Sequence, residues 1–251
     1  MEKPPILVIV PTLGKRNELL RKTLDSIKAQ APISYDIVMV FPLQNKETLA
    51  LAEEYDASVV DDPGGMSAAV NAGVQAAHPH HQYLTWIGDD DLLAPNSLKV
   101  STQTLDQNPG AVLAYGYCDY INSSGQYIFT SRAGRLAPWI MTWGPNLMPM
   151  PGLVMRISAL HKAGEFEVLN NYSMDLDMLL RLKRLGKFVN TKKTLASFRW
   201  HESSQTVANR PKVIKETEAV KRKYLPRYLR PFSPLWDLPV RYATLAVSRR
   251  V

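Results

Sequence analysis

Residues 6–11 read ILVIVP, a continuous apolar run, rich in β-branched residues, that ends at a proline. An apolar run without alternation is typical of a strand buried on both faces of a parallel sheet. Residues 17–30 follow, and four of them recur at the spacing of one helical face: Leu19, Leu20, Leu24 and Ile27. We therefore expect the chain to begin with a buried strand and an amphipathic helix that covers it.

The same alternation continues over the first 110 residues. Strands and helices are predicted in turn at residues 35–42, 46–55, 57–62, 66–78 and 82–91. Ser67 is a candidate N-cap of the last of these helices. Strands that alternate with helices at this spacing form βαβ units. The expected fold class is α/β, with a doubly wound, mostly parallel sheet.

After residue 110 the pattern changes. Residues 111–131 predict two strands around a turn that contains Gly125. Residues 131–151 show no period and are expected to form a long loop. Two helices are predicted beyond it, at residues 158–164 and 174–186.

The charge is concentrated at the C-terminal end. Residues 210–251 contain eleven Lys or Arg and three Asp or Glu, a net charge of +8, whereas the whole chain carries +7. We expect one domain over residues 1–209, with halves that meet near residue 110, and a basic extension over residues 210–251. Such an asymmetry indicates that the extension meets an anionic surface.

Cysteine use and apolar runs favour a cytoplasmic protein. Cys118 is the only cysteine, which excludes an intrachain disulfide, and it is interpreted as a small buried residue. No apolar run approaches the ~18 residues of a transmembrane helix. The first apolar run is bracketed by prolines, so a strand is predicted there and not a signal peptide.

Three consecutive aspartates, Asp89, Asp90 and Asp91, end the strand predicted at residues 82–91. They can cap the next helix, remain solvated or bind a hard cation. Their neighbour Gly88 excludes bulk, and they supply more negative charge than a cap uses. Ligands of such sheets bind beyond the carboxyl ends of the strands. The cluster therefore favours Mg²⁺ or Mn²⁺ held together with a substrate diphosphate.

Six segments in order resemble a known family: residues 8–30, 64–73, 83–98, 150–166, 174–182 and 198–206. The likeness is to family 2 glycosyltransferases of the GT-A fold, of the type that builds bacterial polysaccharides and glycolipids, and it covers roughly residues 5–207. It implies a nucleotide-sugar half and an acceptor half. It also implies that a sugar moves, with inversion, from a nucleotide diphosphate donor to a hydroxyl of a glycan or lipid-linked saccharide.

The resemblance assigns residues to the donor site. Pro11 and Thr12 match positions that line the nucleobase, and Asn71 lies in the matching helix segment. Asp89 matches the first aspartate of the DxD-type motif, near the ribose and the metal, and Asp90 lies between it and the metal ligand. Asp91 matches the last, which is expected to ligate Mn²⁺ or Mg²⁺.

Two more residues take roles from the resemblance. Asp175 matches the general base, and His201 matches a position that in some members reaches the metal or the diphosphate. A sugar hydroxyl needs a carboxylate to accept its proton, and an unperturbed Asp has a pKa of roughly 3.9, so Asp175 is expected to be ionised at neutral pH. The alternative role for Asp175 is a helix N-terminal carboxylate. Asp177 is expected to pair with Arg181 one turn later.

The sequence differs from many members of the family at positions expected to recognise the nucleobase of the donor. Residues 41–47 lack the acidic stretch of many members, and Val70 and Met174 replace an expected arginine and acid. UDP is therefore not favoured over dTDP or GDP. Asp61 or Asp62 can contribute to nucleotide binding in their place, although capping of the strand end also explains one of them.

The extension interleaves basic and aromatic residues, which suits the surface of an anionic bilayer. Packing on the domain is the alternative. Trp143 and Met150 are expected on the acceptor side, or else in a packed lid. Two other functions stay open: a sugar-phosphate nucleotidyltransferase, and a non-catalytic protein that binds nucleic acid or an anionic surface. The single glycine of the loop at residues 11–18 disfavours the first, and the aspartates disfavour the second.

Overall fold

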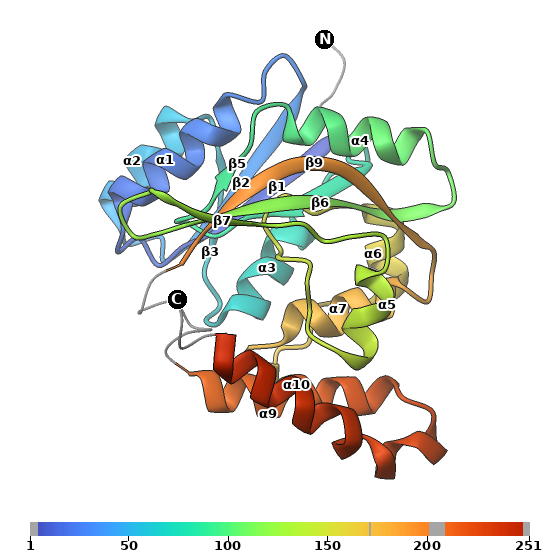
Figure 1. Ribbon diagram of the computed structural model, residues 1–251. Coiled ribbons are helices and arrows are strands. Elements are labelled where there is room, and N and C mark those ends of the chain that lie inside the picture. The colour runs from blue at the N-terminus through green and yellow to red at the C-terminus, as the bar shows by residue number, and fades with distance from the viewer. Residues whose placement is uncertain (1–4, 171, 201–208, 248–251) are drawn as a thin grey trace.

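The computed structural model describes residues 5–170, 172–200 and 209–247, and within them the strands form one nine-stranded sheet. The strand order is β3-β2-β1-β4-β8-β6-β9-β5, and β7 pairs with β6. Figure 1 shows helices on both faces of this sheet, with α9 and α10 beyond α7. The α/β class and the mostly parallel sheet are confirmed.

The elements of the first half follow the predicted alternation. They are β1 (Ile6–Pro11), α1 (Asn17–Lys28), β2 (Tyr35–Phe41), α2 (Lys46–Glu54), β3 (Ser58–Asp61), α3 (Met66–Gln75), β4 (Tyr83–Trp86), β5 (Leu92–Leu93) and α4 (Ser97–Asp106). The remaining elements are β6 (Ala111–Ile121), β7 (Tyr127–Ser131), α5 (Ala137–Trp143), β8 (Val154–Arg156), α6 (Ile157–Ala163), α7 (Met174–Leu182), β9 (Lys187–Arg199), α9 (Arg210–Tyr224), η1 (Arg227–Phe232) and α10 (Pro234–Val247).

The first strand is buried on both faces, as its composition predicts. Ile6, Val8 and Val10 pack with α1, α2 and α4 in one cluster, and Leu7 and Ile9 pack with the opposite layer in another. That opposite layer contains α3, α5, α6 and α7. The two cores hold the carboxyl ends of the parallel strands at fixed positions, and the candidate site is built there.

Two sequence-based expectations are wrong, and one strand was not predicted. The loop expected over residues 131–151 contains α5, whose inward side buries Ala137 and Met141. Ser67 is not the cap of α3, because the helix begins after Gly65 (φ 90°) and Ser67 lies within its first turn. The strand β9, which pairs along most of β6, was not expected at all.

The extension begins with a helix that belongs to the core. Val220 of α9 is buried in the same cluster as α7, and the Nζ of buried Lys221 donates to the carbonyl of Gly144. Trp143 and Trp236 of α10 are in edge-to-face contact, with ring centroids 5.3 Å apart. In the part of the chain that the structure describes, no helix has the length and apolarity needed to cross a membrane.

Candidate active site

One edge of the sheet collects the predicted site residues. The strands β1, β2, β3 and β4 are parallel, so their carboxyl ends lie together. Thr12 follows β1, Asp62 follows β3, and Asp89 to Asp91 follow β4. This is the edge at which sheets of this type bind ligands.

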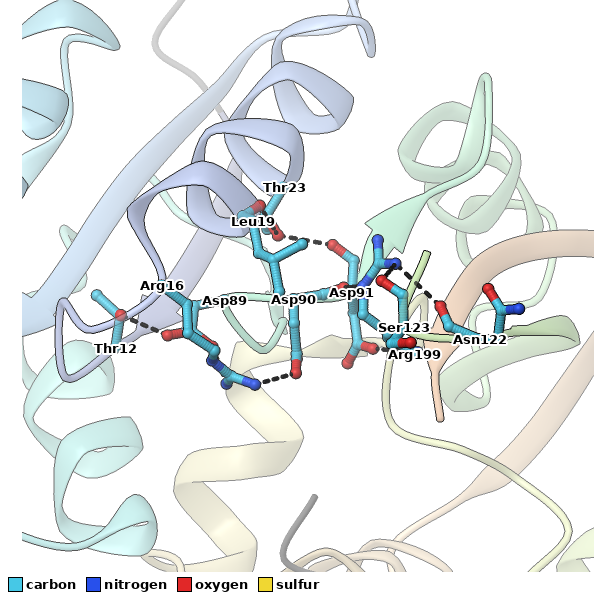
Figure 2. A network of polar contacts seen from close by, with 10 residues as sticks. All are labelled: Thr12, Arg16, Leu19, Thr23, Asp89, Asp90, Asp91, Asn122, Ser123 and Arg199. Atoms are coloured by element: carbon cyan, nitrogen blue, oxygen red, sulfur yellow. Dashed lines mark hydrogen bonds and ion pairs between the residues drawn. The ribbon is translucent and has the colours of Figure 1, made fainter. Parts of the chain in front are cut away.

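Asp89 is held by two side chains from the loop after β1. The Thr12 hydroxyl donates to its Oδ2 (2.6 Å), and the Arg16 guanidinium pairs with its Oδ1. Arg16 also pairs with Oδ2 of Asp90 (2.5 Å), as Figure 2 shows. Burial raises the pKa of Asp89, and the contacts with Thr12 and Arg16 oppose that rise. The arrangement orients Asp89 and partly neutralises the cluster.

Asp91 is the most deeply placed of the three carboxylates. Its Oδ1 accepts the backbone N–H of Arg199 (2.9 Å), and its carbonyl accepts the Thr23 hydroxyl (2.8 Å). Burial, and then the charge of Asp90, raise the pKa of Asp91 well above its usual range. A buried carboxylate beside two others is costly when ionised, and a bound divalent cation would offset that cost.

Gly88 leaves space where two carboxylate oxygens converge. A Cβ at this position would lie 3.3 Å from Oδ1 of Asp90 and 3.3 Å from Oδ2 of Asp91. Any side chain at residue 88 would therefore crowd both oxygens. Two carboxylate oxygens around one open point fit the ligand preference of Mg²⁺ or Mn²⁺. The residues present thus fit a divalent cation at Asp90 and Asp91, where Oδ2 of Asp90 also pairs with Arg16, while Asp89 is held by Thr12 and Arg16.

Asp175 lies in the first turn of α7 and has an unusual environment. Its Oδ1 is inaccessible and is without a hydrogen-bond partner among the described residues. Burial raises the pKa of Asp175 to about 7. The expectation of an ordinary carboxylate pKa is therefore wrong, because the fold removes water from this group without supplying a donor. A proton acceptor with a pKa near 7 suits general base catalysis.

Contacts between helices place Asp175 at the same edge as the aspartate cluster. The helix α3 starts just after β3, and Ser67 in its first turn bonds to Sδ of Met174 (3.2 Å) and to the carbonyl of Asn170 (3.3 Å). The amino end of α7 therefore lies beside the amino end of α3. Asp177 points elsewhere and pairs with Arg181 (2.8 Å), as predicted.

Asp62 and Asn71 both have structural partners. Asp62 accepts the backbone N–H of Gly64 (3.0 Å), which closes the turn before α3. The buried Asn71 amide exchanges two hydrogen bonds with the backbone of Phe166, at 2.9 and 2.8 Å. Their place in the nucleotide-sugar site stays a prediction.

Three other predicted residues lie in the core, against the extension or outside the described part. Met150 is buried in the core, and partly buried Trp143 contacts the extension. Neither placement tests the expected acceptor side. His201 lies outside the described residues.

Sequence reasoning missed three residues that organise the site. Arg16 bridges Asp89 and Asp90, and Arg199 holds Asp91 through its backbone while its Nε donates to the carbonyl of Asp90 (2.9 Å). Glu216 of α9 accepts the backbone N–H groups of Tyr172 and Ser173, at 2.7 Å each. The only signal in the sequence was a basic residue in the first loop, which is common in loops.

A separate polar group could also hold a metal ion. Asp36, His80 and His81 place ligand atoms within 4.8 Å of one another. Asp36 is near the start of β2 and the two histidines precede β4, so the group lies at the amino ends of the strands. It is therefore at the edge opposite the aspartate cluster. His81 is already bonded on both ring nitrogens, to Asp36 (2.8 Å) and to the N–H of His78 (2.9 Å).

Two relatives share limited identity with this chain. A Sinorhizobium fredii protein, described as the uncharacterized protein y4gI, is 26% identical over 226 residues, which cover 83% of this chain and 24% of that protein. The chain thus spans about a quarter of that relative. A Haemophilus influenzae protein, described as an uncharacterized glycosyltransferase, is 21% identical over 206 residues, covering 78% of this chain and 69% of that one.

Solved structures share the fold. A crystal structure of Staphylococcus aureus TarS residues 1–349 superposes with a TM-score of 0.63 at 16% identity, covering 91% of this chain and 72% of that fragment. The complex of the same fragment with UDP gives 0.63 at 15% identity, covering 89% and 70%. The family model described as glycosyl transferase family 2 matches residues 7–170, more than half of the sequence. The chain therefore belongs to glycosyl transferase family 2.

Proposed function

We propose that this protein transfers a glycosyl group, with inversion, from a nucleoside diphosphate sugar to a hydroxyl of a glycan or lipid-linked saccharide. The observation that carries the proposal is the buried Oδ1 of Asp175, which has no described hydrogen-bond partner and belongs to a carboxyl with a pKa of about 7. A helix-capping carboxylate would have its oxygens occupied by backbone N–H groups. No described backbone N–H binds this oxygen, and Asp175 as a whole is only partly buried, which supports contact between its carboxyl group and an incoming hydroxyl.

The reaction is a single displacement. The acceptor oxygen forms a bond to the anomeric carbon as the bond from that carbon to the diphosphate oxygen breaks. The hydroxyl proton passes to Asp175, and the electron pair leaves with the nucleoside diphosphate. Because attack and departure occur on opposite faces, the configuration inverts. Asp175 acts as a proton acceptor, and no covalent intermediate is needed.

The aspartate cluster supplies the donor side. Asp91 and Asp90 would hold a divalent cation near Gly88, and Asp89, fixed by Thr12 and Arg16, would orient the nucleotide. The cation, when bound, neutralises the charge that develops on the leaving diphosphate. The likeness in fold to the UDP-bound TarS fragment favours UDP among the candidate nucleotides.

Release of nucleoside diphosphate tests the reaction. The protein would be incubated with Mn²⁺ and a panel of UDP-, GDP- and dTDP-sugars, with and without a bacterial lipid extract. We expect one donor to be hydrolysed slowly to its diphosphate, and faster when the extract contains the acceptor. If no donor of the panel binds or releases its diphosphate, transfer from these nucleotide sugars is wrong.

The extension favours an anionic membrane surface as a partner. All three of its acidic residues have partners within the protein: Glu216 accepts backbone N–H groups just before α7, Glu218 pairs with Arg241 and Asp237 pairs with Arg222. Its exposed charged residues are basic: Lys212, Lys215, Lys223, Arg227 and Arg230. Each basic residue near an anionic bilayer adds about 1 kcal/mol of binding.

Apolar side chains are exposed in the same segment, on η1 and on α10. Five large ones are 42–73% exposed, and they recur every three or four residues: Tyr228, Phe232, Leu235, Leu238 and Tyr242. We call these five the apolar stripe. Exposed apolar side chains flanked by basic ones are typical of segments that insert into a headgroup layer.

Substitution of the stripe tests membrane binding. The double variant Phe232→Ser, Leu235→Ser is expected to lose most co-sedimentation with liposomes that contain phosphatidylglycerol, while its thermal stability is unchanged because both side chains are exposed. Leu136→Ser, which alters a leucine 67% exposed outside the extension, is the matched control. Deletion of the whole extension would not serve, because α9 packs on α7. Equal sedimentation of the wild type, the double variant and the control would refute membrane binding through the apolar stripe.

A further inference from the structure

The first helix of the extension lies against the helix that carries Asp175. Figure 1 shows α9 beside α7, and Val220 of α9 is buried in the same hydrophobic cluster as Leu176 and Leu179 of α7. Four residues of α9 face α7 or the two residues before it, and they recur at the spacing of one helical face: Glu216, Thr217, Val220 and Tyr224. One face of α9 therefore covers the start of α7.

Two side chains of α9 bind the residues that precede α7. One carboxylate oxygen of Glu216, Oε1, accepts the backbone N–H groups of both Tyr172 and Ser173, at 2.7 Å each. The Thr217 hydroxyl bonds to the Ser173 hydroxyl (2.9 Å). Ser173 is the N-cap of α7, but its side chain makes no capping hydrogen bond. The start of α7 is thus fixed by α9 and not by a side-chain cap of its own.

A second contact with α9 holds α7 one turn later. The Tyr224 hydroxyl donates to Oδ1 of buried Asp177 (2.7 Å), and Lys223 pairs with the same oxygen (3.4 Å). Residues 173 and 177 are four apart, so they share one side of α7. Asp175 is two residues from each, and its side chain therefore leaves the helix on the other side. The contacts with α9 thus bracket Asp175 along the helix.

The position of the Asp175 carboxyl group depends on its helix. Its Oδ1 has no hydrogen-bond partner among the described residues, so the backbone of α7 and the surrounding packing fix where that oxygen lies. A general base must lie within hydrogen-bond reach of the proton that it accepts, and a misplacement of about 1 Å can slow a reaction roughly 10²-fold. Helix ends fray unless their backbone groups are bound. The fixed start of α7 therefore bears directly on the proposed reaction.

We infer that Glu216 is a positioning residue for the proposed general base, because it fixes the start of α7 and thereby the carboxyl group of Asp175. The inference rests on the proposed glycosyl transfer. It gives the basic extension a task in the reaction that is separate from membrane binding, since α9 serves the base while the apolar stripe lies on η1 and α10. A carboxylate that only stabilised the domain would change the melting temperature but not the protonation of Asp175.

The variants Glu216→Ala and Glu216→Gln test the assignment. Alanine removes the acceptor of both N–H groups, whereas glutamine keeps an Oε1 that can accept them. We expect Glu216→Ala to release nucleoside diphosphate at least about tenfold more slowly than the wild type, and Glu216→Gln to stay within about threefold. The calorimetric affinity for UDP·Mn²⁺ should be the same for all three proteins. Glu218→Ala is the matched control, because Glu218 pairs with Arg241 of α10 and not with α7.

NMR of the aspartate carboxyl carbons gives a readout that does not require turnover. The Asp175 signal, identified by its absence in Asp175→Asn, should report a pKa of about 7 in the wild type. Burial causes that raised pKa, so loosening the start of α7 should admit water and lower the pKa of Asp175 in Glu216→Ala. Glu216→Gln and Glu218→Ala should keep the wild-type value. If Glu216→Ala does not fold, Thr217→Val removes only the bond to Ser173 and should shift both readouts in the same direction.

The two readouts distinguish the possible outcomes. A rate and an Asp175 titration in Glu216→Ala that match the wild type would overturn the positioning role and leave the proposed transfer standing. Equal losses in Glu216→Ala and Glu218→Ala would also overturn it, because the extension would then only stabilise the domain. If the wild type releases no diphosphate from any donor, the proposed transfer fails by itself, and the titration still decides whether Glu216 positions Asp175.

Discussion

Asp175→Asn is expected to abolish transfer while UDP·Mn²⁺ still binds with wild-type affinity. The amide keeps the shape of the side chain but cannot accept the proton of the acceptor hydroxyl. Loss of a general base typically slows a reaction by roughly 10²–10⁴-fold. The measurement is kcat for transfer beside the calorimetric affinity for UDP. Turnover within tenfold of the wild type would remove Asp175 from the role of base.

The pKa of Asp175 adds a pH signature that a structural role would not produce. With a pKa of about 7, roughly a tenth of the carboxyl is ionised at pH 6, so kcat should rise steeply between pH 6 and 8. Stability should change in the opposite direction. The folded state binds this proton more tightly than the unfolded state does, so its contribution is present below pH 4 and is lost as pH rises to about 7. Asp175→Asn should therefore be more stable than the wild type at pH 8, by as much as about 4 kcal/mol.

Asp91→Asn is expected to remove the metal dependence of nucleotide binding. The asparagine Oδ1 can still accept the Arg199 N–H, so the fold is retained, but the anionic ligand for the cation is gone. Even indirect partners of metal ligands change affinity by 10–100-fold, so we expect at least about a 100-fold loss in the presence of Mn²⁺. The measurement is calorimetric titration of UDP with and without Mn²⁺.

Asp36→Asn is the control that separates the two possible metal positions. It alters the Asp36, His80 and His81 group at the opposite edge of the sheet and should leave Mn²⁺-dependent UDP binding intact. If Asp36→Asn abolishes that binding and Asp91→Asn does not, the aspartate cluster is not the metal site.

The sequence predicts well those elements whose patterns are local. The run at residues 6–11 identifies β1 because every side chain is apolar, and the periodicity of residues 17–28 identifies α1. In contrast, β9 contains the polar stretch NTKKT and is fixed by pairing with β6, about 75 residues earlier in the chain. Only long-range contacts reveal such a strand. The helix α5 was missed because its proline and tryptophans disguise the helical period.

For the candidate site, too, only the features with a local signal in the sequence could be predicted. Asp89, Asp91 and Asp175 could be singled out because carboxylates at strand and helix ends are conspicuous. Their protonation states could not be predicted, since the pKa of a side chain depends on its burial, and residue type alone does not reveal burial. Arg16 and Arg199 were missed for a related reason: their roles arise from chain segments more than 70 residues away. The extension could not be divided from its composition into the half that packs and the half that is exposed.

Order of synthesis gives the packing of α9 a further meaning. The Glu216 carboxylate closes the amino end of α7, and the Tyr224 hydroxyl bonds to buried Asp177 one turn beyond (2.7 Å). A ribosome makes α7 well before these two residues. The helix α7, which carries the proposed base, thus lacks these contacts until α9 has been made. A nascent or truncated chain that already contains every family motif would therefore remain catalytically silent until α9 emerges and docks.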